Sequence, residues 1–459
     1  MSTPLPALAD ARARPRRGLA ISERRALLAS GDAVAVAAAF LIAFNVHTAQ
    51  VRHVVFQVPR VALGLSVLTW LVATYMVNGY RLVDVVNLRS IFAGVVGTAS
   101  LTVIALLAAF FVEPYRITRP TLLIFIPAAA VLVTVWRVAY RRAFATQIFA
   151  ANLAIICDPA MWERIWADAG PVAARVYRVV DVVNPTRPDA VETIARIVAQ
   201  RGADQVVVGQ RDGMSRELFR VLVSSYDSGT PVRSLADLYE ELTGRLLLDQ
   251  LGHTWLMGLP MRSETSRLYA AFQRVIDLSV GLLGLMLLLP LLPVAAVAAR
   301  LEGGGPVLFR QERLGKYGRP FQILKLRSMR LDEAPGERQT VAGDARVTRF
   351  GAFLRRLHLD ELPQAWNIIK GDMSLIGPRP EQPEHVAMLT REIDFYPTRL
   401  SVRPGLTGWA QVNYGYGEGV EGARVKLSYD LYYIKRQSPA LDVLILVRTL
   451  FAVLSFKGR

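Results

Sequence analysis

The chain has 459 residues, 52% of them hydrophobic, and its 54 basic residues exceed its 38 acidic residues by 16 charges. This length accommodates two or three domains, and a mean hydropathy of +0.30 indicates membrane association. The single cysteine, Cys157, excludes an intramolecular disulfide. We find no zinc spacing and no nucleic-acid-binding module, so we expect no nucleic acid as a partner. Membrane lipid headgroups and a diphosphate substrate explain the positive charge more simply.

Residues 1–29 are predicted to be a basic, disordered tail, because they combine arginines and three prolines without an apolar core. The arginines are Arg12, Arg14, Arg16, Arg17, Arg24 and Arg25. We do not expect a cleaved secretory signal, since the next apolar stretch lacks a cleavage site and further apolar runs follow.

Four apolar runs come next, and each is about long enough to cross a bilayer. They lie at roughly 31–47, 61–78, 91–112 and 120–136. They predict a four-helix transmembrane region over residues 30–142. The arginine-rich tail, together with Arg137, Arg141 and Arg142 after the fourth run, places both ends of this region on the cytoplasmic side.

An aspartate, Asp32, lies at the start of the first apolar run beside Ser30 and Gly31. A carboxylate within a membrane span often has a functional role. At the start of the run, however, we interpret Asp32 as a helix N-terminal residue near the membrane interface.

Residues 143–260 are predicted to form a Rossmann-like α/β domain, because short apolar strands alternate with helical segments. The strands are expected at 152–157, 177–183 and 205–209, with a helix at 191–200. The loop after the first strand reads Cys157-Asp-Pro-Ala-Met-Trp162 and lacks the glycine fingerprint of dinucleotide-binding folds. We therefore expect a structural or regulatory domain that does not bind a dinucleotide.

A further apolar stretch covers about 278–299 and contains Pro290 and Pro293. Its length would allow a fifth span. Basic residues flank it on both sides, which favours a re-entrant hairpin that enters and leaves the membrane on the cytoplasmic face. The prolines would supply the break, since proline disrupts helical hydrogen bonding. A simple kinked span is the alternative.

Two adjacent carboxylates, Asp360 and Glu361, lie between apolar neighbours with several arginines close in sequence. In a helix, consecutive side chains point about 100° apart, so one carboxylate can face a phosphorus atom while the other holds a metal ion or a proton. A bare Asp-Glu pair is usually an exposed acidic turn at a helix start. The motifs around this pair decide against that interpretation.

These motifs occur in a fixed order over residues 265–459. They are Arg274-x-x-Asp277, Gly305-Pro306-Val307, Phe309-Arg-Gln311, Arg313-x-Gly315, Lys325-Leu-Arg-Ser-Met329, Leu359-Asp-Glu-Leu-Pro-Gln364, Gly371-Asp-Met-Ser374, Gly377-Pro-Arg-Pro380 and Arg403-Pro-Gly-Leu-Thr-Gly-Trp-Ala-Gln411. With them the chain resembles the bacterial sugar transferase family, the polyprenyl-phosphate glycosylphosphotransferases, and its front half resembles the long members. The resemblance implies a mostly α-helical catalytic domain over 261–459 with a re-entrant helix. The family breaks this helix at a Ser-Pro pair, whereas this chain has Leu289-Pro290.

The resemblance also implies the reaction. A sugar-1-phosphate would pass from a UDP-sugar to undecaprenyl phosphate with release of UMP, on the cytoplasmic face of the bacterial inner membrane, as the first membrane step of exopolysaccharide, O-antigen or capsule synthesis. By the same resemblance, Asp360 would be the nucleophile that forms an aspartyl-phosphosugar intermediate. Glu361 would assist it, and Mg²⁺ would bind nearby at Asp360. Arg355 and Arg379 match family arginines that contact phosphate.

Other assignments rest on the residues alone. Lys325 and Arg327 would add positive charge to the pocket, although pairing with structural carboxylates is an equal alternative. His358 is interpreted as a packing residue that faces away from Asp360. Trp409 and the tyrosines of 429–433 would either line a uridine pocket or lie at the headgroup level. The donor sugar and the formation of a homodimer stay open.

Two other functions share features with this chain. A membrane-anchored nucleotide-sugar dehydratase would share the four spans and the α/β domain, but it requires a glycine-rich nucleotide loop and a Tyr-x-x-x-Lys dyad, and the chain has neither. A non-catalytic scaffold of a polysaccharide assembly complex would be marked by loss of Asp360, Glu361 or Arg379, and all three are present.

Overall fold

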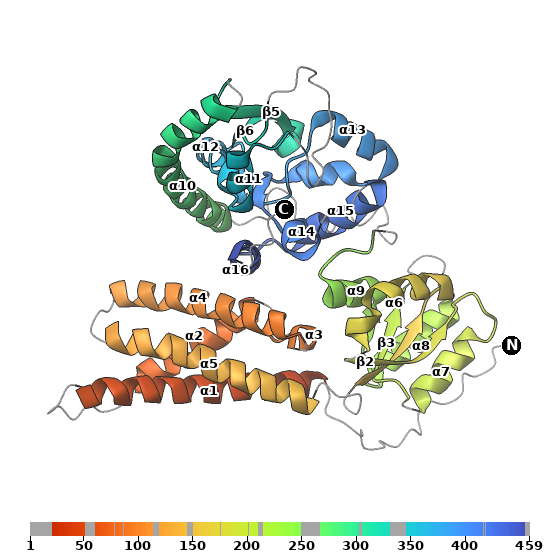
Figure 1. The fold of residues 1–459 in the computed structure, drawn as a ribbon. Helices are drawn as coiled ribbons and strands as arrows, with labels where there is room; N and C mark the ends of the chain where they lie inside the picture. Colours follow the sequence, from red (N-terminus) through yellow and green to blue (C-terminus); the bar gives the residue numbers. More distant parts are fainter. Residues whose placement is uncertain are drawn as a thin grey trace. The chain divides into compact units, whose positions relative to one another are not determined.

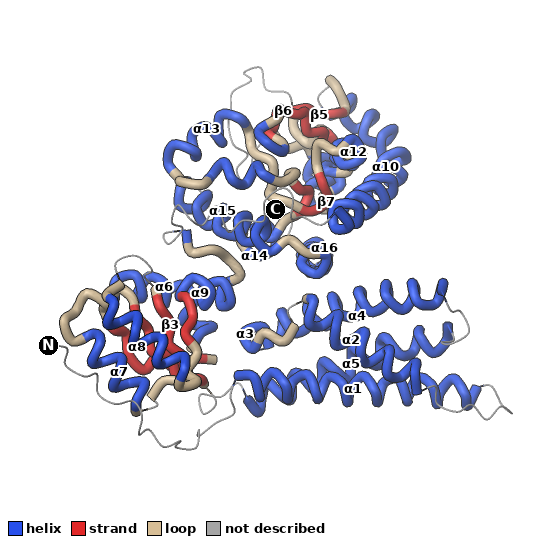
Figure 2. The backbone as a smooth tube through the Cα atoms, turned by 180° about the vertical axis from the view of Figure 1, so that it is seen from behind, coloured by secondary structure: helices blue, strands red, loops and turns tan. Residues whose placement is uncertain are grey.

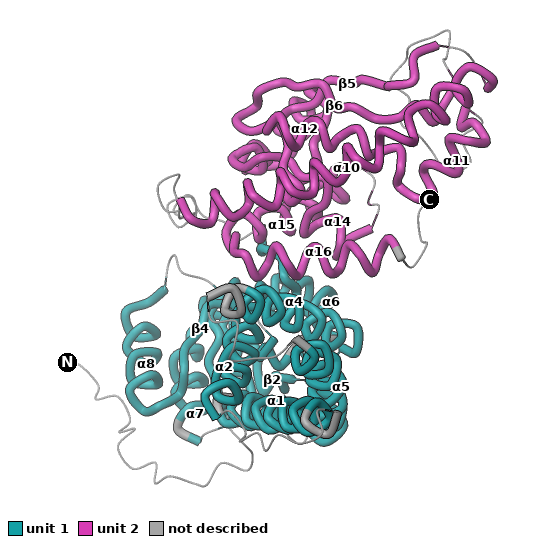
Figure 3. Tube along the Cα trace, turned by 90° about the vertical axis from the view of Figure 1, so that its left-hand side faces the viewer, with its two compact units in different colours: residues 1–250 teal, residues 251–459 magenta. Residues whose placement is uncertain are grey.

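The computed structural model describes residues 21–454. Within that range it leaves out 51–59, 78, 86, 113–118, 145–149, 175, 201, 210–213, 249–266, 303–304, 331–345, 416 and 418. The chain divides into two compact units, Met1–Gln250 and Leu251–Arg459 (Figure 3). Most of the predicted basic tail lies outside the described residues.

The first part of unit 1 is a helical bundle. Its helices are α1 (Ile21–Gln50), α2 (Arg60–Met76), α3 (Leu82–Val85), α4 (Leu88–Val112) and α5 (Arg119–Phe144). Among the described residues, four helices are long and apolar enough to cross a membrane: three of these five, α1, α4 and α5, and helix α10 of unit 2. The four predicted apolar runs correspond to α1, α2, α4 and α5. Of these, α2 has only 17 residues and is shorter than the other three.

The start of α1 corrects two predictions. The helix begins at Ile21, so residues 21–29 are helical and do not belong to a disordered tail. Asp32 consequently lies well inside the helix, and its interpretation as an N-terminal residue is wrong. Its carboxylate is fully buried and accepts two hydrogen bonds from Arg137 of α5, at 2.6 Å from Nη2 and 3.2 Å from Nε. A buried charge is tolerated here because a guanidinium fork neutralises it.

The second part of unit 1 is a parallel α/β layer structure. Its strands are β1 (Ala151–Ile156), β2 (Tyr177–Val183), β3 (Gln205–Val208) and β4 (Val232–Ser234), and its helices are α6 (Pro159–Ala173), α7 (Ala190–Ala199), α8 (Arg216–Asp227) and α9 (Leu235–Thr243). The strand order is β2-β1-β3-β4, and every pair is parallel. Helices α6 and α9 cover one face of the sheet, and α7 and α8 cover the other (Figure 2). The predicted parallel sheet is confirmed, while its classification as Rossmann-like stays a prediction.

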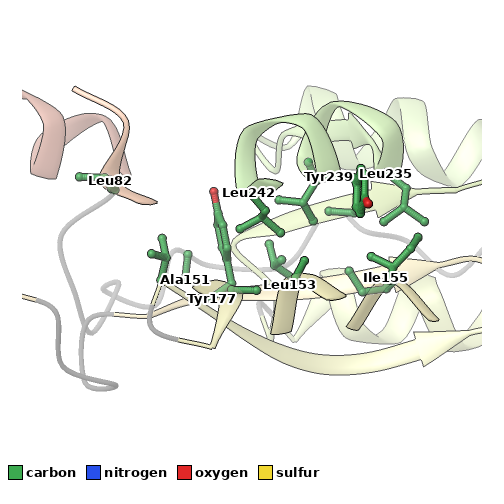
Figure 4. Close-up of a cluster of buried hydrophobic side chains, with 14 of the residues drawn as sticks. Leu82, Ala151, Leu153, Ile155, Tyr177, Leu235, Tyr239 and Leu242 are labelled. Atoms are coloured by element: carbon green, nitrogen blue, oxygen red, sulfur yellow. The ribbon is translucent and has the colours of Figure 1, made fainter. Parts of the chain in front are cut away.

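The bundle and the α/β layers share one hydrophobic core. Leu28, Leu82 and Tyr140 of the bundle belong to the same buried cluster as Leu153 and Leu238 of the α/β layers. Figure 4 labels Leu82 and Leu153 among the side chains of this cluster. Polar contacts reinforce this junction, because Arg25 of α1 forms an ion pair of 3.2 Å with Glu241 of α9. The predicted boundary at residue 143 therefore falls inside a single compact unit.

Unit 2 is mostly helical (Figure 1). Its elements are α10 (Arg267–Glu302), β5 (Leu308–Leu314), η5 (Lys316–Gly318), β6 (Pro320–Leu326), α11 (Arg349–Arg356), η6 (Leu359–Glu361), α12 (Gln364–Lys370), β7 (Ser374–Ile376), α13 (Pro383–Glu392), η7 (Tyr396–Ser401), β8 (Gly405–Thr407), α14 (Trp409–Asn413), α15 (Gly419–Arg436) and α16 (Pro439–Leu454). Strands β5 and β6 form an antiparallel hairpin, and β7 pairs in parallel with β8.

Helix α10 contains the predicted re-entrant segment. It is assigned as one helix of 36 residues that includes Pro290 and Pro293, so the helix continues through the predicted break. Arg274, in the first half of the helix, donates a hydrogen bond of 2.9 Å to the carbonyl oxygen of Ile368. Glu302, at the end of the helix, accepts a hydrogen bond of 3.2 Å from the backbone N–H of Phe350. Both halves of α10 therefore bond to the same compact unit. The re-entrant course through a membrane stays a prediction.

Candidate functional site

The acidic pair is positioned by a tight turn after α11. Gly351 of α11 lies so close to the backbone of Ser328 that a Cβ would be 2.0 Å from the Ser328 carbonyl oxygen, and only glycine permits this approach. The helix therefore packs against the end of β6, which carries Lys325. His358 then adopts a left-handed conformation with φ of 55°, which reverses the chain into η6. Asp360 and Glu361 follow directly.

The two carboxylates have different environments. Glu361 Oε1 lies 2.9 Å from Nζ of Lys325 and 3.2 Å from Nη2 of Arg379, so two cations share one carboxylate. Asp360 is buried, with 9% of its surface exposed. Among the residues that the structure describes, its carboxylate forms no ion pair. The site thus contains one neutralised carboxylate and one that is available.

This difference separates the acidities of the pair. Burial raises the pKa of Asp360 above its usual value, as does the negative charge of Glu361, and the positive charges of Lys325 and Arg355 offset this only in part. Burial also opposes ionisation of Glu361. Its contacts with Lys325 and Arg379 outweigh that effect, however, and lower the pKa of Glu361 to about 2. Asp360 is therefore the more basic carboxylate.

The turn that carries Arg379 is fixed by an ion cluster. Arg399, which is buried, donates to the carbonyl oxygen of Arg379 at 3.0 Å and to Asp430 at 2.9 Å. Glu381, directly after the turn, lies 3.7 Å from Arg399. Burial opposes ionisation of Glu381, but its hydrogen bond with His385 and the positive charge of Arg399 outweigh burial and lower its pKa to about 2. We did not predict Arg399, Glu381 or Asp430 from sequence. The only signal was the position of Glu381 next to the Gly-Pro-Arg-Pro motif.

Two other motifs anchor the helix that follows the acidic pair. Asn367 of α12 donates to the carbonyl oxygen of Gln322 at 2.8 Å and accepts from the N–H of Leu324 at 3.1 Å, which joins α12 to β6. Asp277 of α10 accepts from Ser374 Oγ at 2.9 Å and from the N–H of Leu375 at 2.7 Å. The Arg-x-x-Asp and Gly-Asp-Met-Ser motifs thus meet and support the site from behind.

The remaining predicted residues have mixed outcomes. Arg355, in the last turn of α11, lies close enough to Asp360 to influence its ionisation. Arg327 lines an open hollow of about 640 Å³ together with residues 306–310, and its role in phosphate binding stays a prediction. His358 is exposed, so its interpretation as a packing residue is wrong. Trp409 is buried and stacks on Tyr432 at 5.9 Å, an arrangement that contributes to the core of unit 2.

The acidic residues of the site fit a lightly coordinated magnesium ion. Among the described residues there is no group of three histidine, cysteine or acidic side chains that could enclose a metal. Magnesium commonly takes one or two carboxylates and completes its shell with substrate phosphates and water. The carboxylate of Asp360, which pairs with no cation of the described ranges, meets this minimum.

Comparison with known proteins agrees with the motifs. A model of the bacterial sugar transferase family matches residues 268–456. The chain is 43% identical over 257 residues to a UDP-N-acetylgalactosamine-undecaprenyl-phosphate N-acetylgalactosaminephosphotransferase of Aeromonas hydrophila, covering 56% of this chain and 60% of the relative. It is 37% identical over 255 residues to a UDP-glucose:undecaprenyl-phosphate glucose-1-phosphate transferase of Xanthomonas campestris pv. campestris, covering 54% and 52%.

A third relative is covered more completely. The UDP-glucose:undecaprenyl-phosphate glucose-1-phosphate transferase of Caulobacter vibrioides is 45% identical over 186 residues, which cover 40% of this chain and 70% of the relative. The matched part of the chain spans little more than half the length of the first two relatives.

Proposed function

The chain belongs to the bacterial sugar transferase family, and from this premise we propose that it transfers a sugar-1-phosphate from a UDP-sugar to undecaprenyl phosphate and releases UMP. The observation that carries the proposal is the asymmetry of the acidic pair. Glu361 is bound by Lys325 and Arg379, whereas Asp360 is buried and has no ion-pair partner in the part of the chain that the structure describes. The reaction would be the first membrane step of a surface polysaccharide.

The first half-reaction uses Asp360 as nucleophile. Its carboxylate oxygen bonds to the phosphorus that carries the sugar, while the bond from that phosphorus to the UMP oxygen breaks and UMP leaves with the electron pair. The partial burial of Asp360 weakens its hydration and keeps it basic. Arg379 and Lys325, held in place by Glu361, lie where they can neutralise the phosphate oxygens as the two anions approach.

The second half-reaction returns the enzyme to its starting state. A phosphate oxygen of undecaprenyl phosphate attacks the phosphorus of the aspartyl-phosphosugar, and the bond to Asp360 breaks. The carboxylate is regenerated, and the lipid leaves as a diphosphate-linked sugar. Protons and charges balance without an additional reactant. Magnesium bound at Asp360 and the substrate phosphates would reduce the negative charge of the site.

The geometry of α10 supports a catalytic unit that stays on one side of the membrane. A helix of 36 residues is about 54 Å long, well beyond the roughly 30 Å hydrocarbon core of a bilayer. Arg274, in the first half of α10, and Glu302, at its end, nevertheless bond to other elements of unit 2. The part of α10 between these two residues has an exposed apolar face, which includes Leu282, Met286 and Leu289. We propose that the middle part of α10 enters the cytoplasmic leaflet, and that both ends of the helix stay on the cytoplasmic side.

The function is tested by incubating membranes that contain the protein with undecaprenyl phosphate and a panel of UDP-sugars, and measuring UMP. The first donors to test are UDP-glucose and UDP-N-acetylgalactosamine, which the names of two relatives of this chain contain. UMP release that requires both the lipid and one of the sugars supports the proposal. Lipid-independent release, or none with any donor, contradicts it.

The pH dependence of kcat/KM should show an acid limb from Asp360. Because the pKa of Asp360 is raised, its nucleophilic form is lost as the pH falls through a value above 3.8, while Glu361 stays ionised to about pH 2. The limb should approach a tenfold loss per pH unit. Glu361→Gln removes a negative neighbour and should move the limb to lower pH. A limb that Glu361→Gln does not move would assign the titration to another group.

The topology of α10 can be tested with cysteines at Arg267 and Arg300, which are both exposed and lie near opposite ends of the helix. In a chain carrying Cys157→Ala, an impermeant maleimide should label both positions from the cytoplasmic side only. A cysteine at Arg52, in the loop predicted to face outward, provides the opposite-side control. Labelling of the two ends of α10 from opposite sides would show a full crossing and refute the hairpin.

The catalytic unit should work without unit 1. The transferase motifs all lie after residue 265, so a chain beginning at Arg262 is expected to keep measurable UMP release in nanodiscs. Unit 1 should bind no NAD(P), because it lacks the glycine fingerprint. That binding test requires the whole of unit 1, because the α/β layers share a core with the bundle. Complete inactivity of a well-folded, membrane-inserted truncation would place part of the active site in unit 1.

A further inference from the structure

Helix α8 carries an exposed apolar stripe on a layer of the α/β structure. Phe219, Val223 and Tyr226 follow one another at i, i+4 and i+7, and they are 60%, 43% and 67% exposed. This spacing places the three side chains along one flank of the helix. The core-facing side of α8 is separate and buries Leu218 and Leu222 against the sheet. The helix is therefore apolar on two sides, and only one of them is covered.

The charges beside this stripe form a pattern with opposite signs at its two ends. Arg216 and Arg220 lie near the first turn, and Asp227 is the last residue of the helix. At 100° per residue, all three project on the same side of the stripe. Among the ion pairs of the described residues, none involves any of these three side chains. The N-terminal part of this edge is basic and the C-terminal end is acidic.

We propose that α8 packs antiparallel against α8 of a second copy of this chain, about a two-fold axis near Val223. In this arrangement residue 223 minus n lies opposite residue 223 plus n of the other copy. Arg220 then comes level with Tyr226 and Asp227 of the second copy, and the symmetric contact forms at the other end. An isologous interface requires this kind of self-complementarity. A symmetric parallel pairing would instead place the charges of the two copies on opposite edges of the interface, where they cannot pair.

The surroundings of α8 leave room for a second copy within unit 1. The sheet face covered by α7 and α8 has its own buried cluster, which contains no residue of the bundle. The residues that join the bundle to the α/β layers lie in the cluster on the opposite face. One helix pair is a small interface, but anchoring of both copies in one membrane raises their effective concentration and lowers the affinity that pairing requires.

The test uses the full chain in native membranes with Cys157→Ala, Val223→Cys and a short bismaleimide. Val180→Cys is the matched control, because Val180 is 44% exposed and lies on β2, at the opposite edge of the sheet from β4. Val223→Cys should give a covalent dimer in most chains, and Val180→Cys little. Absence of a dimer at position 223, or equal yields at both positions, would overturn the proposal.

Charge reversal then tests the register. Arg220→Asp or Asp227→Arg alone places like charges opposite each other and should reduce the crosslinked fraction at Val223→Cys several-fold. The two reversals combined restore opposite charges and should restore the yield. If the combined variant crosslinks as poorly as the single variants, the antiparallel pairing is wrong. Expression level and a monodisperse size-exclusion profile in detergent report whether each variant is folded.

Discussion

Replacing Asp360 by asparagine is expected to abolish UMP release while leaving expression and membrane insertion unchanged. The substitution keeps the volume of the side chain but removes the oxygen anion that would bond to phosphorus. Loss of a residue that forms a covalent intermediate commonly costs on the order of 10⁴-fold or more in kcat. The measurement is UMP release by membranes adjusted to equal protein content. Activity above roughly a tenth of the wild-type rate would exclude Asp360 as the nucleophile.

Two neighbouring substitutions serve as controls for this result. Glu361→Gln should reduce the rate less than Asp360→Asn, because Glu361 holds Lys325 and Arg379 instead of reacting. His358→Asn should keep the rate within a few-fold, since asparagine tolerates the positive φ of that position and the side chain is exposed. Equal losses in all three variants would point to a collapsed turn.

The sequence predicted the centre of the site because the acidic pair and Arg379 belong to short motifs. Lys325 was predicted either to add charge to the pocket or to pair with a carboxylate. It pairs with Glu361, and its contribution to phosphate binding stays a prediction. The cluster around Arg399 could not be predicted in this way. Arg399 and Asp430 are 31 residues apart, so nothing in local spacing connects them. Only the fold brings α15 to the turn after β7.

The misreading of α1 has a physical cause. The arginines before residue 30 indicated a solvated tail, because charged side chains are rarely buried. Arg24 is nevertheless buried in the helix, and the carbonyl oxygen of Arg24 accepts a hydrogen bond from Tyr140 at 3.0 Å. Asp32 was assigned to a helix N-terminus because of its place at the start of the apolar run, and Arg137 to the cytoplasmic cluster after the fourth run. A charge pair between helices more than 100 residues apart is visible only after the bundle has been assembled.

The Asp32–Arg137 pair should dominate the stability of the bundle. Asp32→Asn leaves the guanidinium of Arg137 buried without its counter-charge, and breaking a buried pair in this way typically costs about 3–5 kcal/mol. With ordinary unfolding entropies this corresponds to a decrease in Tm of roughly 6–20 °C. The measurement is thermal unfolding of the detergent-solubilised chain followed by fluorescence-detected size-exclusion chromatography.

A double variant separates loss of the pair from loss of charge. Asp32→Asn combined with Arg137→Gln removes both charges and keeps two groups that can hydrogen-bond, so it should recover at least half of the lost Tm. Arg142→Gln, an exposed arginine on the same helix, should change Tm by no more than a surface substitution does. If Asp32→Asn melts like the parent chain, water reaches Arg137 and the pair is not buried in the folded bundle. If the double variant is less stable than Asp32→Asn, the two side chains support α1 and α5 through separate contacts.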